Sequence, residues 1–387
     1  MCRRMLEVVK SHLAAAAVLS LALSPMPLAA RESRAQSAPT TTPLPAPPPA
    51  LAEPDLCTEK LTPPGFTPSV LAARTPPEYP EADAAEESEG FVRVGFTIAA
   101  DGETKDIVVL DQVGSPAMAK AARLAVARWT YKPATQDGLP VDQYANSAEV
   151  VFRAQHVGNA PIHDAVLATY DEGRRLIGEG KYAEGIAVLE QSFDQPLTLY
   201  EQAKVSFALA FAYEKSNDTL RALAHIRHAL VERGAYLEKA VVPAAQRMRL
   251  RIEVANGNLL YAACAAPLPP ADTAFDPTGA DLKATTKVVD DVMKKLASEK
   301  PLQVDATLVA KSGGGKTAVW EHPLSRRRFK FAALVGSVNE FRLSCIRQLT
   351  NGPVNETAQW SVPRSVGPCT LRVYGDAGAA LKLIEEW

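Results

Sequence analysis

The chain of 387 residues is poor in the groups on which most enzyme sites are built, and it lacks the motifs that usually hold them. It contains 6 histidines, and no H-E-x-x-H pair, C-x-x-C pair or G-x-S-x-G elbow occurs in it. Aromatic residues make up only 6%, and the net charge of -2 leaves no basic excess for neutralising nucleic-acid phosphates. The sequence therefore predicts no catalytic residues, no cofactor, no metal and no nucleic-acid partner. A site that is assembled only in the fold would leave no such motif, so an enzyme stays open as an alternative.

One glycine-rich segment, residues 312–317 (SGGGKT), resembles a phosphate-binding loop, but its surroundings argue against that function. Such a loop has a glycine at the position that Ala310 occupies here, and it leads into a helix whose N-terminus faces the phosphate. Residues 318–320 (AVW) instead continue the pattern of a strand. We therefore expect a hairpin turn, and no nucleotide as a ligand.

The N-terminus has the pattern of an export signal. Arg3, Arg4 and Lys10 precede an apolar run at 13–23, which has the length of a signal-peptide core and is short for a membrane-spanning helix. We expect residues 1–35 to be a signal peptide and the proline-rich residues 36–74 to be an extended linker. This predicts a periplasmic protein. The alternative is an uncleaved segment that anchors the protein in the inner membrane, facing the periplasm.

Four cysteines follow the signal region, and an even number suits an exported protein with disulfides. Three pairings are possible. The predicted bridges are Cys345–Cys369, inside one β-rich region, and Cys57–Cys264, between two distant regions. Zinc binding is the alternative, although no zinc-ligand spacing is present.

Two clusters of cationic or metal-ligating side chains are interpreted as surface features. His225 and His228 have a helical spacing that could share a metal, but the sequence near them provides no third ligand, so both are expected to be exposed. The basic run at 326–330 (RRRFK) is expected to be a solvated strand end, with a patch that contacts anions as the alternative.

The most informative pattern lies between residues 75 and 155, in the order strand, strand, helix, strand. Asp101 and Gly102 can form a tight hairpin, and Ser115 and Pro116 have the residue types of a helix N-cap and first helical position. The expected elements are strands at 91–98, 107–110 and 148–152, with Val92, Val94, Phe96 and Ile98 on one face, and a helix that begins at Ser115.

This order, with Tyr79-Pro80 before it and Trp129-x-Tyr131-x-Pro133 after the helix, closely resembles the C-terminal domain of the TonB energy-transducer family. The resemblance implies a protein-binding module on which an extended segment of an outer-membrane receptor adds as a strand beside the last strand. The alternative is that this edge pairs internally or in self-association. The implied partner-binding residues are Gln143, Tyr144, Asn146, Ser147, Glu149, Val150, Val151, Phe152 and Arg153.

Residues 162–266 have a helical pattern that repeats after 37 residues. Small residues coincide in the two copies, as at Gly173 with Ala210 and at Gly185 with Ala222, where two helices would lie close together. The pattern resembles tetratricopeptide repeats, whose usual period is about 34 residues. We therefore expect helical hairpins that stack on one another.

Residues 281–387 are predicted to form one amphipathic helix followed by a β-rich domain of the sandwich type. The strands are expected at 303–310, 317–321, 329–335, 341–347, 357–362 and 370–374. The predicted fold class is α+β multidomain: a TonB-like β-β-α-β module at 75–155, tetratricopeptide-like hairpins at 162–266 and a C-terminal β-rich domain.

The leading functional hypothesis is a periplasmic adaptor that captures an extended segment of an envelope protein by β-augmentation. Its partner could be a TonB-dependent outer-membrane receptor. One alternative is a membrane-anchored energy transducer of the TonB type, and another is an envelope enzyme with its site in the β-rich domain. The short proline-rich spacer and the two domains that follow the module depart from the transducer arrangement, which favours the adaptor.

Overall fold

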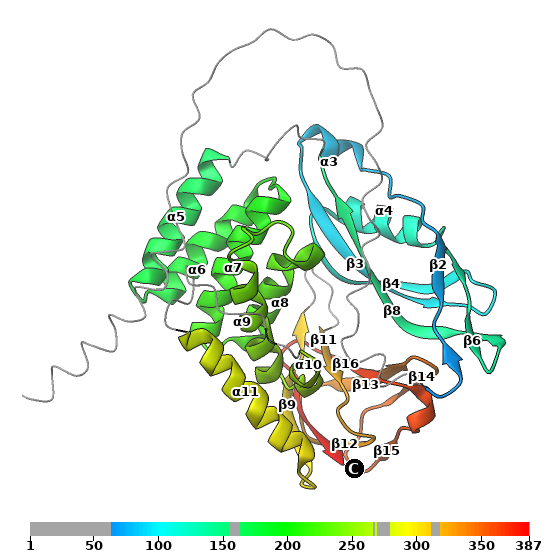
Figure 1. The fold of residues 1–387 in the computed structure, drawn as a ribbon. Coiled ribbons are helices and arrows are strands. Elements are labelled where there is room, and N and C mark those ends of the chain that lie inside the picture. Colours follow the sequence, from blue (N-terminus) through cyan, green and yellow to red (C-terminus); the bar gives the residue numbers. More distant parts are fainter. Residues whose placement is uncertain (1–62, 155–162, 266–267, 269–278, 311–317, 387) are drawn as a thin grey trace, which may run out of the picture.

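The computed structural model describes residues 63–154, 163–265, 268, 279–310 and 318–386. In these residues, helices and strands form three parts that lie against one another (Figure 1). A small sheet with a helix comes first, a stack of helices follows, and a β-sandwich comes last. None of the helices in this part of the chain combines the length and the apolar character needed to cross a membrane.

The first part is a three-stranded antiparallel sheet with a helix on one face, and we call it the module. β3 (Gly90–Ile98) lies between β4 (Thr104–Val113) and β8 (Gln143–Phe152), and α4 (Pro116–Val126) packs on the sheet. The predicted apolar face of β3 is confirmed. The side chains on this face of β3 are buried in one core with Met118, Ala122 and Trp129.

The local signals at the turns of the module act as predicted. Gly102 has a φ of 91° between β3 and β4, in the left-handed region that glycine adopts without steric cost. Ser115 Oγ accepts a hydrogen bond from the N–H of Met118 at 3.2 Å, and Pro116 stands in the first turn of α4. The hairpin and the helix start therefore both follow from local residue choice.

Several short elements of the module were not predicted. Residues 66–73, which were expected to be linker, form β1 (Phe66–Thr67) and β2 (Val70–Ala73). They pair with β6 (Ala134–Gln136) and β5 (Thr130–Lys132) respectively, and β7 (Leu139–Val141) pairs with β6. A short helix, α3 (Glu81–Ala85), precedes β3. Prolines 68, 133 and 140 interrupt these strands, so they gave no alternating pattern.

The second part is a stack of helices in which successive helices pack side by side (Figure 1). Gly173 and Gly185 lie where the first two helices approach most closely, because a Cβ on residue 185 would come within 2.9 Å of Gly173 O. The helices are α5 (Asp164–Gly178), α6 (Tyr182–Glu190), α7 (Leu199–Lys215), α8 (Thr219–Ala229), α9 (Val242–Ala255) and α10 (Leu259–Cys264), with one-turn 3-10 helices η1 (Gln191–Asp194) and η2 (Val231–Arg233).

α11 (Ala280–Ala297), the predicted amphipathic helix, closes the stack at α9. Its Asp281 accepts hydrogen bonds at 2.5 Å from both Arg247 and Arg251 of α9. Arg247 is fully buried, and the carboxylate therefore compensates its charge. The contact fixes the helix that leads into the last part of the chain.

The last part is a sandwich of two antiparallel sheets around a core that contains Phe329, Phe331, Phe341, Leu371 and Leu383. Two of its strands, β14 and β17, were not predicted. The segment 312–317 lies outside the described residues, and a strand follows it. In spatial order, one sheet contains β10 (Val309–Ala310), β11 (Ala318–Pro323), β16 (Cys369–Gly375), β13 (Val338–Cys345) and β14 (Leu349–Pro353), and the other β15 (Gln359–Ser361), β12 (Arg328–Val335), β17 (Ala380–Glu386) and β9 (Leu302–Thr307).

Candidate functional site

β8, the strand implied as a binding edge, lies at one side of the module's sheet. Its ladder with β3 runs from Phe152 opposite Gly90 to Gln143 opposite Ile98, and no second strand pairs with it within the described residues. Ala145 has a φ of 59° at the point where the register shifts by one residue. Such a bulge twists an edge strand, which limits indiscriminate pairing.

Two of the predicted partner-binding residues belong to the core of the module. Val150 and Phe152 are 0% and 1% exposed, and both pack in the cluster that contains Met118. The ring of Tyr79 meets Phe152 edge-on at 5.7 Å, and its hydroxyl donates to Ser88 O at 2.6 Å. Burial raises the pKa of Tyr79 to about 12. Val150 and Phe152 can therefore offer a partner only their main chain.

The opposite face of β8 lies against the helical stack. Glu149 accepts a hydrogen bond from the N–H of Glu232 at 3.1 Å, and Val151 packs against a cluster formed by Phe91, Leu199 and Val231. Arg153 forms an ion pair with Glu232, and its guanidinium lies 5.4 Å from the centre of the Tyr236 ring. The far end of the edge is therefore held by the loop after α8. No motif in the sequence marks Glu232 or Tyr236 as neighbours of β8.

The polar side chains at the start of β8 brace the bulge. Gln143 Nε2 donates to Asn146 Oδ1 at 2.6 Å, and Asn146 Nδ2 donates to Gln143 O at 2.7 Å. Gln143 Oε1 also accepts a hydrogen bond from the N–H of Ser69 at 2.9 Å. Ser147, in contrast, is exposed. Of Gln143, Asn146 and Ser147, Ser147 is thus the one whose side chain faces solvent.

The main chain of Tyr144 is bound by a segment that is distant in the sequence. Its N–H donates to Ile346 O at 2.9 Å, and Arg347 Nη1 donates to Asp142 O at 2.8 Å. Ile346 and Arg347 belong to the turn between β13 and β14 of the sandwich, beside the start of β8 (Figure 1). These residues could not be predicted, because the contact between Arg347 and Asp142 joins positions 205 apart and has no motif.

Charged side chains from all three parts meet behind the module's sheet. Burial alone would raise the pKa of Glu321 in the sandwich, but Arg372 beside it lowers that pKa to about 2, with help from Arg93 of β3 and Arg227 of α8. Buried side chains of opposite charge hold one another in a fixed geometry, because an unpaired charge there would be costly. The ion pairs are His228 with Asp111 at 3.1 Å, Arg227 with Glu253 at 2.9 Å and Arg372 with Glu321 at 2.7 Å.

The two histidines of α8 are half-buried, which corrects the expectation that they are exposed. His228 bonds Asp111, and His225 stacks on Tyr213 with ring centres 5.4 Å apart. Burial lowers the pKa of His225 to about 3, so it is neutral at pH 7. In the part of the chain that the structure describes, no group of three or more potential ligands could hold a metal ion.

The start of the basic run is also not a solvated strand end. Arg326 is 2% exposed, and its guanidinium donates to Ser298 O at 2.6 Å and to Lys300 O. Arg327 donates to Gly367 O at 2.8 Å. These two guanidinium groups therefore bind main-chain carbonyls at corners of the sandwich rather than an external anion.

The predicted disulfide between Cys345 and Cys369 is confirmed, and it joins β13 to β16 with a Cα–Cα distance of 4.0 Å. Cys264 is disulfide-bonded too. Cys57, which was expected to be its partner, lies outside the described residues. The first bridge stands at the base of the turn that contacts β8.

A buried histidine–glutamate pair in the sandwich is the arrangement most similar to catalytic chemistry. His322 Nε2 lies 2.7 Å from Glu385 Oε1, and the other oxygen of Glu385 accepts the N–H groups of Ser325 and Arg326. His322 and Glu385 are both 0% exposed, and Trp320 stacks on the imidazole. A substrate could not reach the pair, which therefore stabilises a corner of the sandwich.

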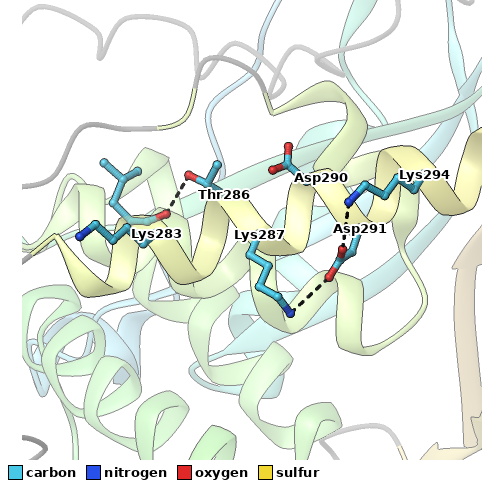
Figure 2. Close-up of a pocket in the computed structure, with 7 residues that line it drawn as sticks. Lys283, Thr286, Lys287, Asp290, Asp291 and Lys294 are labelled. Carbon is cyan, nitrogen blue, oxygen red and sulfur yellow. Dashed lines mark hydrogen bonds and ion pairs between the residues drawn. The ribbon is translucent and has the colours of Figure 1, made fainter.

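A surface hollow of about 430 Å³ lies along the exposed face of α11 (Figure 2). Lys287 and Lys294 both pair with Asp291, at 3.5 and 3.8 Å. The hollow therefore presents charges that compensate one another in water, where such pairs contribute little. All its lining residues come from this one helix: Leu282, Lys283, Thr286, Lys287, Asp290, Asp291 and Lys294.

Comparison with known proteins gives matches to the module. Residues 75–154 match the family described as Gram-negative bacterial TonB protein C-terminal. Protein TonB of Pseudomonas aeruginosa is 40% identical over 70 residues, which are 18% of this chain and 20% of that protein.

Two solved structures are similar as well. The solution structure of the Pseudomonas aeruginosa TonB C-terminal domain is 31% identical, covers 24% of this chain and 92% of its own, and has a TM-score of 0.20. The TonB2 protein of Vibrio anguillarum is 24% identical and covers 32% of this chain and 100% of its own, with a TM-score of 0.21. Since the matched stretch spans only a fifth of Protein TonB, the similarity applies to the module and not to whole proteins. Residues 75–154 of this chain are therefore similar to the TonB C-terminal domain family.

Proposed function

We propose that the chain is a periplasmic adaptor whose module binds an extended segment of another envelope protein as an added strand along β8. The similarity of residues 75–154 to TonB C-terminal domains supports a role in binding envelope proteins. The observation that carries the proposal is the hydrogen bond from Tyr144 N–H to Ile346 O at 2.9 Å, because this edge already binds a main-chain carbonyl from outside the sheet. A TonB-dependent outer-membrane receptor fits the proposed partner, and we propose no catalytic activity.

In this proposal the residues of β8 have different roles. Val150 and Phe152 keep the strand in place by burying their side chains, so the main chain of β8 supplies the affinity. Ser147 is exposed and would lie beside the added segment. Glu149 and Arg153 stand at the far end, where their contacts with Glu232 hold the strand against the helical stack.

Photocrosslinking in cells tests this proposal. A photoreactive p-benzoylphenylalanine replaces Ser147 in the full exported chain, and the matched control replaces Val335, which is 63% exposed on the sandwich. We expect irradiation to link Ser147 to an extended segment of an envelope protein, identified by mass spectrometry of the crosslinked peptide, and to leave Val335 without that product. Equal products from both positions, or none from Ser147, would contradict the proposal.

A second candidate function is a membrane-anchored TonB-type energy transducer. The observation that favours it is the 40% identity of the module to Protein TonB over 70 residues. In that case the N-terminal apolar run at 13–23 stays attached and holds the protein in the inner membrane. N-terminal sequencing of the mature protein separates the two functions: cleavage after residue 30 or 35 leaves the adaptor, and an intact N-terminus favours the transducer.

We also propose that residues 162–266 are tetratricopeptide-like hairpins that offer a second binding groove. Gly173 and Gly185 support this, since they permit close helix packing, and so does the complete burial of Ala210 and Ala222 at the equivalent positions. In this proposal the module at 75–155, the hairpins at 162–266 and the region 281–387 are separate domains in sequence. Tyr200, Lys204, Phe207 and Phe211 form the partly exposed stripe of α7 that would face a bound segment.

A further inference from the structure

The turn between β13 and β14 has a shape that the sandwich fixes in advance. Cys345 N–H donates to Gln348 O at 2.8 Å across the turn, and Arg347 N–H donates to Val366 O at 3.0 Å. The disulfide from Cys345 to Cys369 ties the base of the turn to β16, which pairs with β13 in the sheet. The carbonyl of Ile346 and the side chain of Arg347 are therefore presented outward by a rigid support.

These outward groups occupy the start of the β8 edge in the way an added strand would. The carbonyl of Ile346 receives the Tyr144 N–H at 2.9 Å, which is a main-chain bond of the kind that joins two strands. Arg347 adds a charged hydrogen bond to Asp142 O at 2.8 Å, and its guanidinium lies 5.8 Å from the centre of the Phe66 ring. A main-chain carbonyl followed by an arginine side chain thus satisfies the site.

The position of the guanidinium combines one main-chain acceptor with an aromatic ring. Asp142 offers its carbonyl to Arg347, while its carboxylate binds Lys105 Nζ at 2.7 Å and the N–H of Ala100 at 3.0 Å. Phe66 is 7% exposed, so its ring forms a wall beside the guanidinium. A side chain without a hydrogen-bond donor in place of the guanidinium would leave the Asp142 carbonyl without this bond.

We propose that the Ile346–Arg347 turn is an internal occupant of the partner-binding edge, and that an external segment binds there by displacing it. The inference rests on the proposed function, and it adds the chemistry of the partner and a control on access. The external segment is extended and carries an arginine, so that its main-chain carbonyl and its guanidinium reproduce the contacts of Ile346 O and Arg347. Because the occupant belongs to the same chain, its effective concentration at the start of the edge is high, and the Tyr144 N–H is rarely free until a matching partner is present.

The test compares Arg347→Ala with Arg328→Ala in the full chain that carries the photoreactive residue at position 147. Arg328 is exposed in the other sheet of the sandwich, so its loss controls for removing one arginine. Loss of one charged hydrogen bond shifts an equilibrium by about tenfold or more. We therefore expect about tenfold more crosslinked product with Arg347→Ala than with Arg328→Ala. Amide hydrogen exchange at Tyr144 should become faster in Arg347→Ala alone.

The inference requires both changes. If crosslinking occurs equally in the two variants, the proposed function stands and the internal occupant is refuted. If exchange at Tyr144 is the same in both variants, Arg347 does not hold the turn on the edge, and the inference is refuted as well. If neither variant gives any product at position 147, binding along β8 is itself refuted, and the inference falls with it.

Discussion

The packing of α5 on α6 gives a prediction in which two known effects have opposite signs. Replacing Gly185 by alanine should stabilise an isolated helix by about 1 kcal/mol, since alanine has the higher helix propensity. In the folded chain, however, the new Cβ would lie 2.8 Å from Ile177 Cγ1 and 2.9 Å from Gly173 O. A main-chain oxygen cannot rotate away, so the two helices must separate. Overpacking of this kind costs about 1–3 kcal/mol.

We therefore expect Gly185→Ala to destabilise the α5–α6 pair by about 1–2 kcal/mol in net terms. Gly178 provides a matched control in α5, because it is exposed and nothing lies within 4 Å of the position of its added Cβ. Gly178→Ala should stabilise α5 by up to about 1 kcal/mol, because alanine has the higher helix propensity. The two variants make the same chemical change and differ in their surroundings.

Hydrogen exchange measured by mass spectrometry on the full chain is the suitable assay. A chain with several parts has no single unfolding free energy, whereas exchange reports the local opening of α5 and α6. Exchange in these helices should be about 5–30 times faster in Gly185→Ala than in the wild type. Equal or slower exchange in Gly185→Ala would refute the close packing of the helices, and with it the main support for the tetratricopeptide-like interpretation.

Three further predictions follow from buried groups. Burial alone would raise the pKa of Asp111, but the charge and hydrogen bond of His228 lower it to about 2. The stability that Asp111 contributes is therefore present above about pH 4 and lost as the pH falls toward 2, and urea unfolding at a series of pH values should show Asp111→Asn to be less sensitive in that range. Replacing Cys345 and Cys369 by alanine should destabilise the sandwich by about 3.5 kcal/mol in the chain-entropy account, since the bridge spans a sequence separation of 24, and exchange in β13 would show it. Phe152→Ala should destabilise the module by about 3–5 kcal/mol, measured by exchange in β3, because this side chain is 1% exposed.

Local patterns predicted the module well. The alternation at 92–98, the glycine at 102 and the N-cap at Ser115 each act over a few residues, and the structure uses all of them. β1, β2 and β5 to β7 were missed because each has two to four residues and prolines lie between them. Strands this short are stabilised by their partners in the fold, so they leave no periodic signal.

The surroundings of the candidate site could not be predicted for a different reason. The resemblance of residues 75–154 pointed to β8, but the groups that contact this strand come from Glu232 and from Ile346 and Arg347. Nothing in a sequence marks two segments 83 to 205 positions apart as neighbours when no family covers both. The same holds for His228, which is half-buried because its imidazole bonds Asp111 of the module's β4.

The covered face of the module has a consequence for how the region can be handled. Phe91, Val113 and Val151 are shielded by residues of α7 and of the loop after α8, and Asp111 receives its partner from α8. An excised fragment of residues 75–154 would present this apolar patch and an uncompensated carboxylate to water. We therefore expect such a fragment to precipitate or to pair with itself. In this chain, the module depends on the helical stack to cover one face of its sheet, so graft experiments should carry both parts together.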